Sequence, residues 1–185
     1  MRKSLVFIFI ALPLFLLPAG CKEKRINLGN GISFDKEENI SYGNDAAQIM
    51  DLYIPHDQPS EKRDVFMIIH GGGWRSGNKS QLTFFTLSMM QRFPDHIFAN
   101  INYRLASQTQ FGIPNQMDDI KSAAAFLKKK LNYTPQLILL GNSAGGHLSM
   151  LYAYHFDSLR SVKSVINIVG PADLTDPGFK TYADY

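Results

Sequence analysis

The chain has 185 residues, of which 45% are hydrophobic and 19% charged, a composition typical of one globular domain. Nineteen Lys and Arg against sixteen Asp and Glu give a formal charge of +3, which is too small to predict a nucleic-acid partner. The 14 Gly and 9 Pro exclude a collagen-like or low-complexity chain, and a single Cys cannot form an internal disulfide.

The first twenty residues have the layout of a bacterial export signal. Arg2 and Lys3 precede an apolar run over 5–17, which is shorter than the roughly twenty residues that span a bilayer. Two small residues stand directly before Cys21, so the segment resembles a lipoprotein signal, in which the Cys is diacylated and becomes the new N-terminus. We therefore predict a signal peptide over 1–20 and a lipid anchor at the surface of a membrane of the bacterial cell envelope. An ordinary cleaved signal, which releases a periplasmic or secreted protein, is the alternative.

Residues 21–39 are polar at their start and rich in Lys, Asn and Gly, which predicts a tether between the lipidated Cys and a folded domain over 40–185. Apolar runs and helical periodicity alternate through that domain. In chain order they predict a strand at Ala47–Ile54, a strand at Val65–Ile69, a helix at Asn78–Phe93, a strand at Ile97–Ile101, a helix at Pro114–Leu131, a strand at Leu137–Leu140, a helix at Ala144–His155 and a strand at Val162–Val169. This alternation predicts an α/β fold with a mainly parallel sheet.

The strand Leu137–Leu140 runs into residues 141–146, which read G-N-S-A-G-G and lead directly into a helix. This is a G-x-S-x-G nucleophile elbow, in which small flanking residues permit a tight turn from strand to helix. The turn presents Ser143 at the carboxyl end of the sheet, beside a helix N-terminus that favours developing negative charge. Ser143 is therefore the predicted nucleophile, and a glycine-rich turn with a structural Ser is the alternative.

The sequence H-G-G-G-W begins at His70, directly after a predicted strand. Consecutive glycines let a loop turn its N–H groups towards a ligand, and fixed donors stabilise the charge of a tetrahedral intermediate. We predict an oxyanion hole formed by the N–H groups of Gly72, Gly73 and Ala144, with the ring of His70 bracing the loop. A phosphate cradle is the alternative, but the G-x-x-x-x-G-K-[ST] spacing is absent from the sequence.

Together with the segments Asp51–Pro55, Asn102–Ala106 and Gly170–Leu174, these motifs resemble the α/β-hydrolase superfamily over roughly residues 40–176. Within it, the chain is similar to carboxylesterases related to hormone-sensitive lipase, especially the branch of bacterial acetyl xylan and feruloyl esterases. The resemblance implies a three-layer α/β-hydrolase sandwich. It also implies a serine carboxylic-ester hydrolase that acts, through an acyl-enzyme and without a cofactor, on short-chain acyl, acetyl or feruloyl esters, such as those of plant polysaccharide.

The catalytic triad is incomplete in this sequence. The only histidines after Ser143 are His147 and His155, on the helix that begins at the nucleophile, whereas the family places its His after the last strand. Asp173 follows the strand Val162–Val169, where a few lipases carry their acid; we predict a structural role for it, with the catalytic acid as the alternative.

We therefore predict that the last strands and helices of the fold are missing from the 185 residues, and that this chain is inactive alone. An incomplete record of a longer enzyme is favoured, because an unpaired apolar edge strand invites aggregation. A catalytically incomplete hydrolase-like binding protein and a serine peptidase of the same fold are the alternatives. No metal-binding motif is visible in the sequence.

Overall fold

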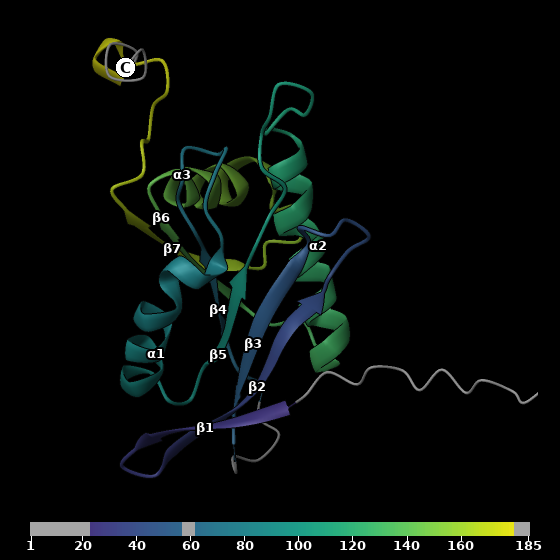
Figure 1. The fold of residues 1–185 in the computed structure, drawn as a ribbon, viewed down its shortest axis with the longest axis vertical. Coiled ribbons are helices and arrows are strands. Elements are labelled where there is room, and N and C mark those ends of the chain that lie inside the picture. The colour runs from purple at the N-terminus through teal and green to yellow at the C-terminus, as the bar shows by residue number, and fades with distance from the viewer. Residues whose placement is uncertain (1–22, 57–61, 180–185) are drawn as a thin grey trace, which may run out of the picture.

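The computed structural model describes residues 23–56 and 62–179, in which strands and helices alternate after an N-terminal hairpin (Figure 1). The strands are β1 (Glu23–Gly29), β2 (Ile32–Ser41), β3 (Ile49–Pro55), β4 (Val65–Ile69), β5 (Ile97–Ile101), β6 (Leu137–Asn142) and β7 (Val162–Ile168). The helical segments are η1 (Lys79–Leu82), α1 (Thr83–Arg92), α2 (Asn115–Leu131), α3 (Ala144–Leu151) and η2 (Tyr152–Phe156), the last a π-helical turn. None of the helices in the described ranges is long and apolar enough to cross a membrane.

The described strands form one seven-stranded sheet with the order β1-β2-β3-β5-β4-β6-β7. The pairs β4–β5, β4–β6 and β6–β7 are parallel, whereas β1, β2, β3 and β5 pair antiparallel in succession. Five strands therefore run in one direction, and only β1 and β3 oppose them. The mainly parallel sheet predicted from the sequence is confirmed, with β7 as the edge strand next to β6.

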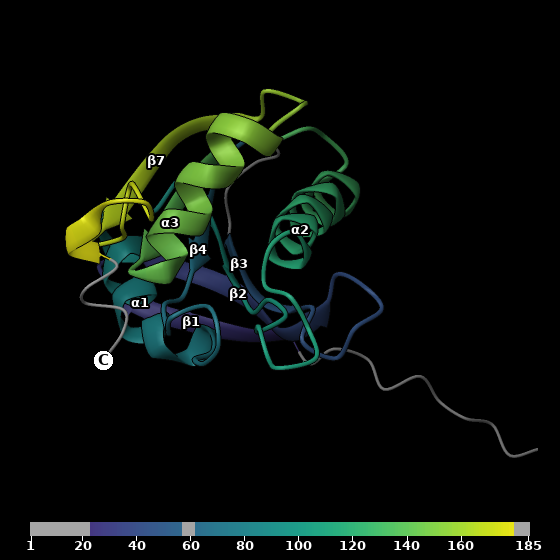
Figure 2. The same ribbon diagram turned by 90° about the horizontal axis from the view of Figure 1, so that it is seen from above.

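Helices cover both faces of the sheet and create two separate cores (Figure 2). Side chains of α2 and α3, among them Ile120 and Leu148, pack against one face. Met90 of α1 packs against the other face, where Phe66 and Phe98 stack with ring centroids 5.1 Å apart. Both β4 and β5 are buried along their whole length, as expected for central strands covered on both sides. The predicted three-layer sandwich is confirmed.

The predicted tether over 21–39 is wrong for the residues that the structure describes. Residues 23–41 form the antiparallel hairpin β1–β2, which extends the sheet. The hairpin turns at Gly29–Gly31, whose three residues all have positive φ angles. Phe34 of β2 is fully buried and packs edge-on against Phe98, with ring centroids 6.1 Å apart. Burial of this aromatic side chain stabilises a hairpin whose outer residues are polar. The signal peptide and Cys21 lie outside the described residues.

Candidate active site

Ser143 lies at a sharp turn between β6 and α3. Its backbone has φ 52° and ψ −120°, a strained conformation for a residue with a side chain. The turn is held by three backbone hydrogen bonds, one from the Ser143 N–H to the Ile168 carbonyl at 2.8 Å and two to the Ser143 carbonyl, from the N–H groups of Gly146 at 2.9 Å and His147 at 3.1 Å. The Ser143 side chain makes no hydrogen bond within the described residues and does not cap α3. The sharp turn from strand to helix is the one that the sequence predicts, and the role of Ser143 as nucleophile stays a prediction.

The glycines around Ser143 are required by close backbone contacts. A Cβ at Gly141 would overlap the Gly145 carbonyl, and a Cβ at Gly145 would overlap the Ile69 carbonyl at the end of β4. Gly146 is less restricted, because a Cβ there would overlap the side-chain oxygen of Asn167 on β7, which can move, and would lie 3.1 Å from the Gly141 carbonyl. The motif in the sequence accounts for Gly141 and Gly145 but not for Gly146. Each glycine thus lets α3 begin directly against the neighbouring strands.

We expect Gly145→Ala to destabilise the fold by about 1–3 kcal/mol, because the added methyl group must push α3 away from the backbone of β4. The measurement is the free energy of unfolding in urea. Gly178→Ala is the matched control, since its only neighbour within 4 Å of a new Cβ is the flexible carboxylate of Asp176. Equal unfolding midpoints for the two variants would contradict the steric role of Gly145.

The predicted oxyanion loop follows β4 and lies against the elbow. Ile69 of β4 pairs with Gly141 of β6, so both loops leave the same end of the sheet. A Cβ at Gly71 would lie 3.2 Å from the Cβ of Ser143. Gly72 and Gly73 have φ angles of 121° and 57°, which turn the loop so that their N–H groups make no hydrogen bond within the described residues.

The carbonyl of Gly72 closes this loop on itself. It accepts hydrogen bonds from the N–H groups of Arg75 and Ser76 at 3.2 and 3.0 Å and from the Ser76 hydroxyl at 2.9 Å. Because this carbonyl shares a planar peptide group with the N–H of Gly73, it also fixes the direction of that N–H. The first N–H of α3, that of Ala144, completes the set of predicted donors, because the first N–H groups of a helix have no intrahelical acceptor.

His70 lies beneath the loop as a buried ring. Its Nδ1 is 2.7 Å from the Gly71 carbonyl, and its ring stacks on Tyr103 with centroids 4.3 Å apart. The Tyr103 hydroxyl in turn donates to the His70 carbonyl at 2.9 Å. Both rings are about 1% exposed, so neither can reach a substrate directly. This geometry supports the predicted bracing role of His70 and adds Tyr103, whose role the sequence did not show.

Trp74 and His147 connect the oxyanion loop to the nucleophile helix. The indole N–H of Trp74 donates to Nδ1 of His147 at 3.3 Å, and the two rings meet edge to face at 89°. His147 lies four residues after Ser143 on the same helix and is only 8% exposed. The sequence places His147 on the helix that begins at Ser143, and the structure adds that its ring is buried against Trp74.

Burial lowers the pKa of His70, His96 and His147, and only for His70 does a hydrogen bond, to Gly71, oppose the effect. The unfolded chain therefore takes up protons at a higher pH than the folded one. The stability from these neutral rings is present above the unfolded pKa of about 6.5 and is lost as the pH falls below it. We expect the free energy of unfolding to fall between about pH 8 and pH 5.5, and to fall less in His147→Gln. A pH-independent value over this range would contradict the prediction.

Within residues 23–56 and 62–179, no acidic side chain hydrogen-bonds to the Ser143 hydroxyl. Within the described residues, no histidine ring hydrogen-bonds to Ser143, and His155 lies exposed on η2. Asp173 is exposed, and its Oδ1 accepts hydrogen bonds from the N–H and hydroxyl of Thr175 at 2.7 and 2.6 Å. These contacts are those of a turn, which supports the predicted structural role of Asp173.

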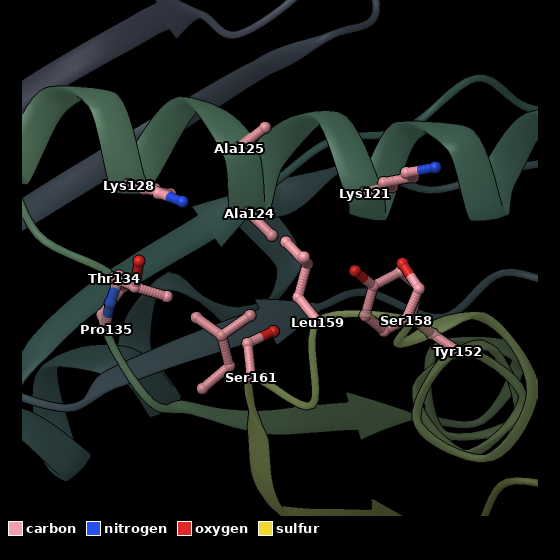
Figure 3. Close-up of a pocket in the computed structure, with 11 residues that line it drawn as sticks. Lys121, Ala124, Ala125, Lys128, Thr134, Pro135, Tyr152, Ser158, Leu159 and Ser161 are labelled. Carbon is pink, nitrogen blue, oxygen red and sulfur yellow. The ribbon is translucent and has the colours of Figure 1, made fainter.

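Two hollows in the structure lie in different places relative to Ser143. One, of about 300 Å³, is lined by His147 and Ala172 and so lies one helical turn from Ser143. The other, of about 230 Å³, is lined by residues of α2, among them Lys121 and Lys128, and by the loop before β7 (Figure 3). Its lining includes the first residue of β6, so it lies at the opposite end of that strand from Ser143. Of these two hollows, only the first is lined by side chains of α3, and the rest of its lining lies further along, on η2 and at Ala172.

A model of the BD-FAE family matches residues 50–182, which is more than half of the chain. The chain belongs to the BD-FAE family. The matched range contains the β4 loop, the elbow and Asp173. The resemblance to α/β-hydrolase esterases is thereby confirmed at the level of the family.

Two curated relatives of this BD-FAE chain carry the names of hydrolases. It is 28% identical to "Esterase LipC" of Mycobacterium tuberculosis, over 60% of this chain and 28% of that protein. It is 31% identical to "Kynurenine formamidase avaC" of Aspergillus versicolor, over 63% of this chain and 45% of that protein. A solved structure, "Bifunctional GH43-CE" of Bacteroides eggerthii, superposes with a TM-score of 0.62 at 25% identity, covering 76% of this chain and 21% of that one. The chain thus spans less than half of each of these proteins.

Proposed function

We propose that this chain carries the nucleophile and oxyanion hole of a serine carboxylic-ester hydrolase. The observation that carries the proposal is the strained Ser143 between β6 and α3, beside a loop whose Gly72 and Gly73 N–H groups make no internal hydrogen bond. A nucleophile next to unpaired donors is what an acyl-transfer reaction needs. Membership of the BD-FAE family and the relatives named above support the same reaction class.

In the proposed reaction, the Ser143 oxygen attacks the carbonyl carbon of the ester while a general base takes the hydroxyl proton. The former carbonyl oxygen becomes negatively charged and is held by the N–H groups of Gly72, Gly73 and Ala144. The C–O bond to the alcohol then breaks, and the base returns its proton to the departing alcohol. Water attacks the acyl-enzyme, and the acid and free Ser143 are released. Within the described part of the chain, no histidine ring hydrogen-bonds to the Ser143 hydroxyl, and the proposal assigns the general base to none of these residues.

The proposed substrates are small-molecule or carbohydrate esters of short acyl, acetyl or feruloyl groups. A second candidate is the hydrolysis of a formamide, which the relative named kynurenine formamidase favours. The same nucleophile and oxyanion hole serve both reactions, because each passes through a tetrahedral intermediate at a carbonyl carbon. A direct comparison of p-nitrophenyl acetate with an aryl formamide decides between them.

A covalent trap tests whether Ser143 is a nucleophile at all. An aryl phosphonate ester forms a stable tetrahedral adduct on an activated serine and loses its aryloxide. We expect the intact mass to rise by one phosphonyl group, peptide mapping to place the group on Ser143, and Ser143→Ala to remain unlabelled. The trap is applied both to this chain and to a version extended along its genomic reading frame. Absence of labelling in both would favour the alternative of a hydrolase-like binding protein.

We also propose that the protein is lipid-anchored at the bacterial cell envelope through Cys21. The proposal rests on the apolar run over 5–17 and the small residues directly before the chain's only Cys. Growth with an alkyne-bearing fatty acid is expected to label the wild-type protein and not Cys21→Ser. Equal labelling of both would exclude Cys21 as the anchor.

A further inference from the structure

Trp74 occupies an unusual place between the two halves of the proposed oxyanion hole. It directly follows Gly73 and itself has a φ of 63°, so three successive residues of the loop hold left-handed backbone conformations. Such a conformation costs a non-glycine residue of order 1–3 kcal/mol and persists only when surrounding contacts determine it. The contacts of Trp74 therefore identify what fixes this loop.

The backbone and the side chain of Trp74 form hydrogen bonds with different parts of the fold. Its carbonyl accepts hydrogen bonds from the N–H of Ala106 at 2.8 Å and from the side-chain amide of Gln116 at 2.9 Å. Its indole N–H reaches His147 on α3. Within the described part of the chain, no other hydrogen bond joins the loop over 70–77 to α3. The contact with His147 is thus the polar link between the loop and the helix that carries Ser143.

The chemistry of the link defines the state of His147. An indole N–H can only donate, so Nδ1 of His147 must present its lone pair and the ring proton must lie on Nε2. The ring is buried, and burial lowers its pKa, which favours this neutral form. The backbone N–H of the same residue donates to the Ser143 carbonyl at 3.1 Å, so the backbone of His147 is fixed relative to Ser143, and the bond with Trp74 holds the ring.

We propose that Trp74 and His147 are positioning residues, which set the distance between the Gly72–Gly73 donors and the Ala144 donor of the oxyanion hole. This inference rests on the proposed function of the same site. Catalysis depends on donor placement, since a misplacement of about 1 Å can lower the rate of an enzyme 100-fold. Neither side chain touches the substrate in this role; both act through the backbone of the loop and the helix.

The kinetic test compares Trp74→Phe, His147→Leu and the double variant in a form that hydrolyses p-nitrophenyl acetate. We expect each single variant to lower kcat by about 10- to 100-fold with KM within about twofold, and the double variant to be no slower than either one. His147→Gln, whose amide oxygen can accept the indole N–H, is expected to recover most of kcat. Arg92→Gln, which changes an exposed side chain at the end of α1 on the other face of the sheet, is the control. Multiplying effects in the double variant would overturn the proposal.

A second measurement does not depend on turnover. In NMR spectra of this chain, we expect His147 as the Nε2–H tautomer, and the amide signals of Gly72, Gly73 and Ala144 to shift alike in Trp74→Phe and in His147→Leu, with no further shift in the double variant. An Nδ1–H tautomer, or unchanged amide signals, would overturn the positioning role. If Ser143→Ala retained full turnover, the proposed function would fail, whereas these NMR results would still decide the structural link.

Discussion

Ser143→Ala is expected to lower kcat for p-nitrophenyl acetate by about 10⁴-fold or more. The reason is that the Ser143 oxygen forms the new bond to the carbonyl carbon of the ester, and no neighbouring hydroxyl can replace it. The oxyanion donors remain in the variant, because they belong to the backbone of Gly72, Gly73 and Ala144. A small residual rate above water is therefore expected, as in serine hydrolases that lose their nucleophile.

The measurement is the rate of p-nitrophenol release, made on this chain and on a version extended along its genomic reading frame. Ser149→Ala is the matched control, since this buried hydroxyl lies on the same helix and donates to the Gly145 carbonyl at 2.7 Å. The control is expected to stay within about twofold of the wild type. If both variants lost activity equally, the loss would reflect the helix and not the nucleophile. Turnover by this chain alone that needs Ser143 would contradict the expectation that it is inactive by itself.

The parts of the fold with strong local signals were predicted correctly from the sequence. The strands Val65–Ile69 and Ile97–Ile101 have the predicted bounds, because fully buried central strands are mostly apolar runs; Asn100 is the one polar residue in the two. The predicted helix over Ala144–His155 instead changes to a π-helical turn after Leu151. The hairpin over 23–41 was missed because a polar edge hairpin resembles a linker until the burial of Phe34 is known.

The candidate site, like the fold, has features that the sequence predicts and features that it does not. Gly141 and Gly145 were predictable because they flank Ser143 in a recognisable motif, although only the contact of Gly141 with the Gly145 carbonyl is local, and Gly145 is restricted by the distant Ile69 carbonyl. The link between Trp74 and His147 was not predictable, because it joins residues 73 positions apart. The resemblance had drawn attention to Asn102–Ala106 without giving its physical role. In the structure this segment connects β5 to the base of the oxyanion loop, through the hydrogen bond from Tyr103 to His70.

Asp119 of α2 fixes that segment in place. Its carboxylate is fully buried and accepts hydrogen bonds from the backbone N–H of Arg104 at 2.7 Å, from the Arg104 guanidinium at 2.6 and 2.8 Å, and from the side-chain amide of Gln48 at 2.7 Å. One side chain therefore joins α2, the segment after β5 and the segment before β3. Because Arg104 directly follows Tyr103, the same carboxylate also supports the residue that holds His70.

Asp119→Ala is accordingly expected to destabilise the fold by about 3–5 kcal/mol, because it leaves a largely buried guanidinium and two further donors without their acceptor. Urea unfolding followed by the fluorescence of the single Trp, at position 74, measures the change. Asp118→Ala is the matched control: it removes the neighbouring carboxylate, which is exposed in the first turn of α2, and is expected to cost about 1 kcal/mol or less. If the two variants were equally stable, the buried carboxylate would not hold the Arg104 segment. The fluorescence emission of Trp74 in the folded Asp119→Ala variant is a second measurement. A changed emission would show that the Asp119 carboxylate on α2 acts on the predicted oxyanion loop.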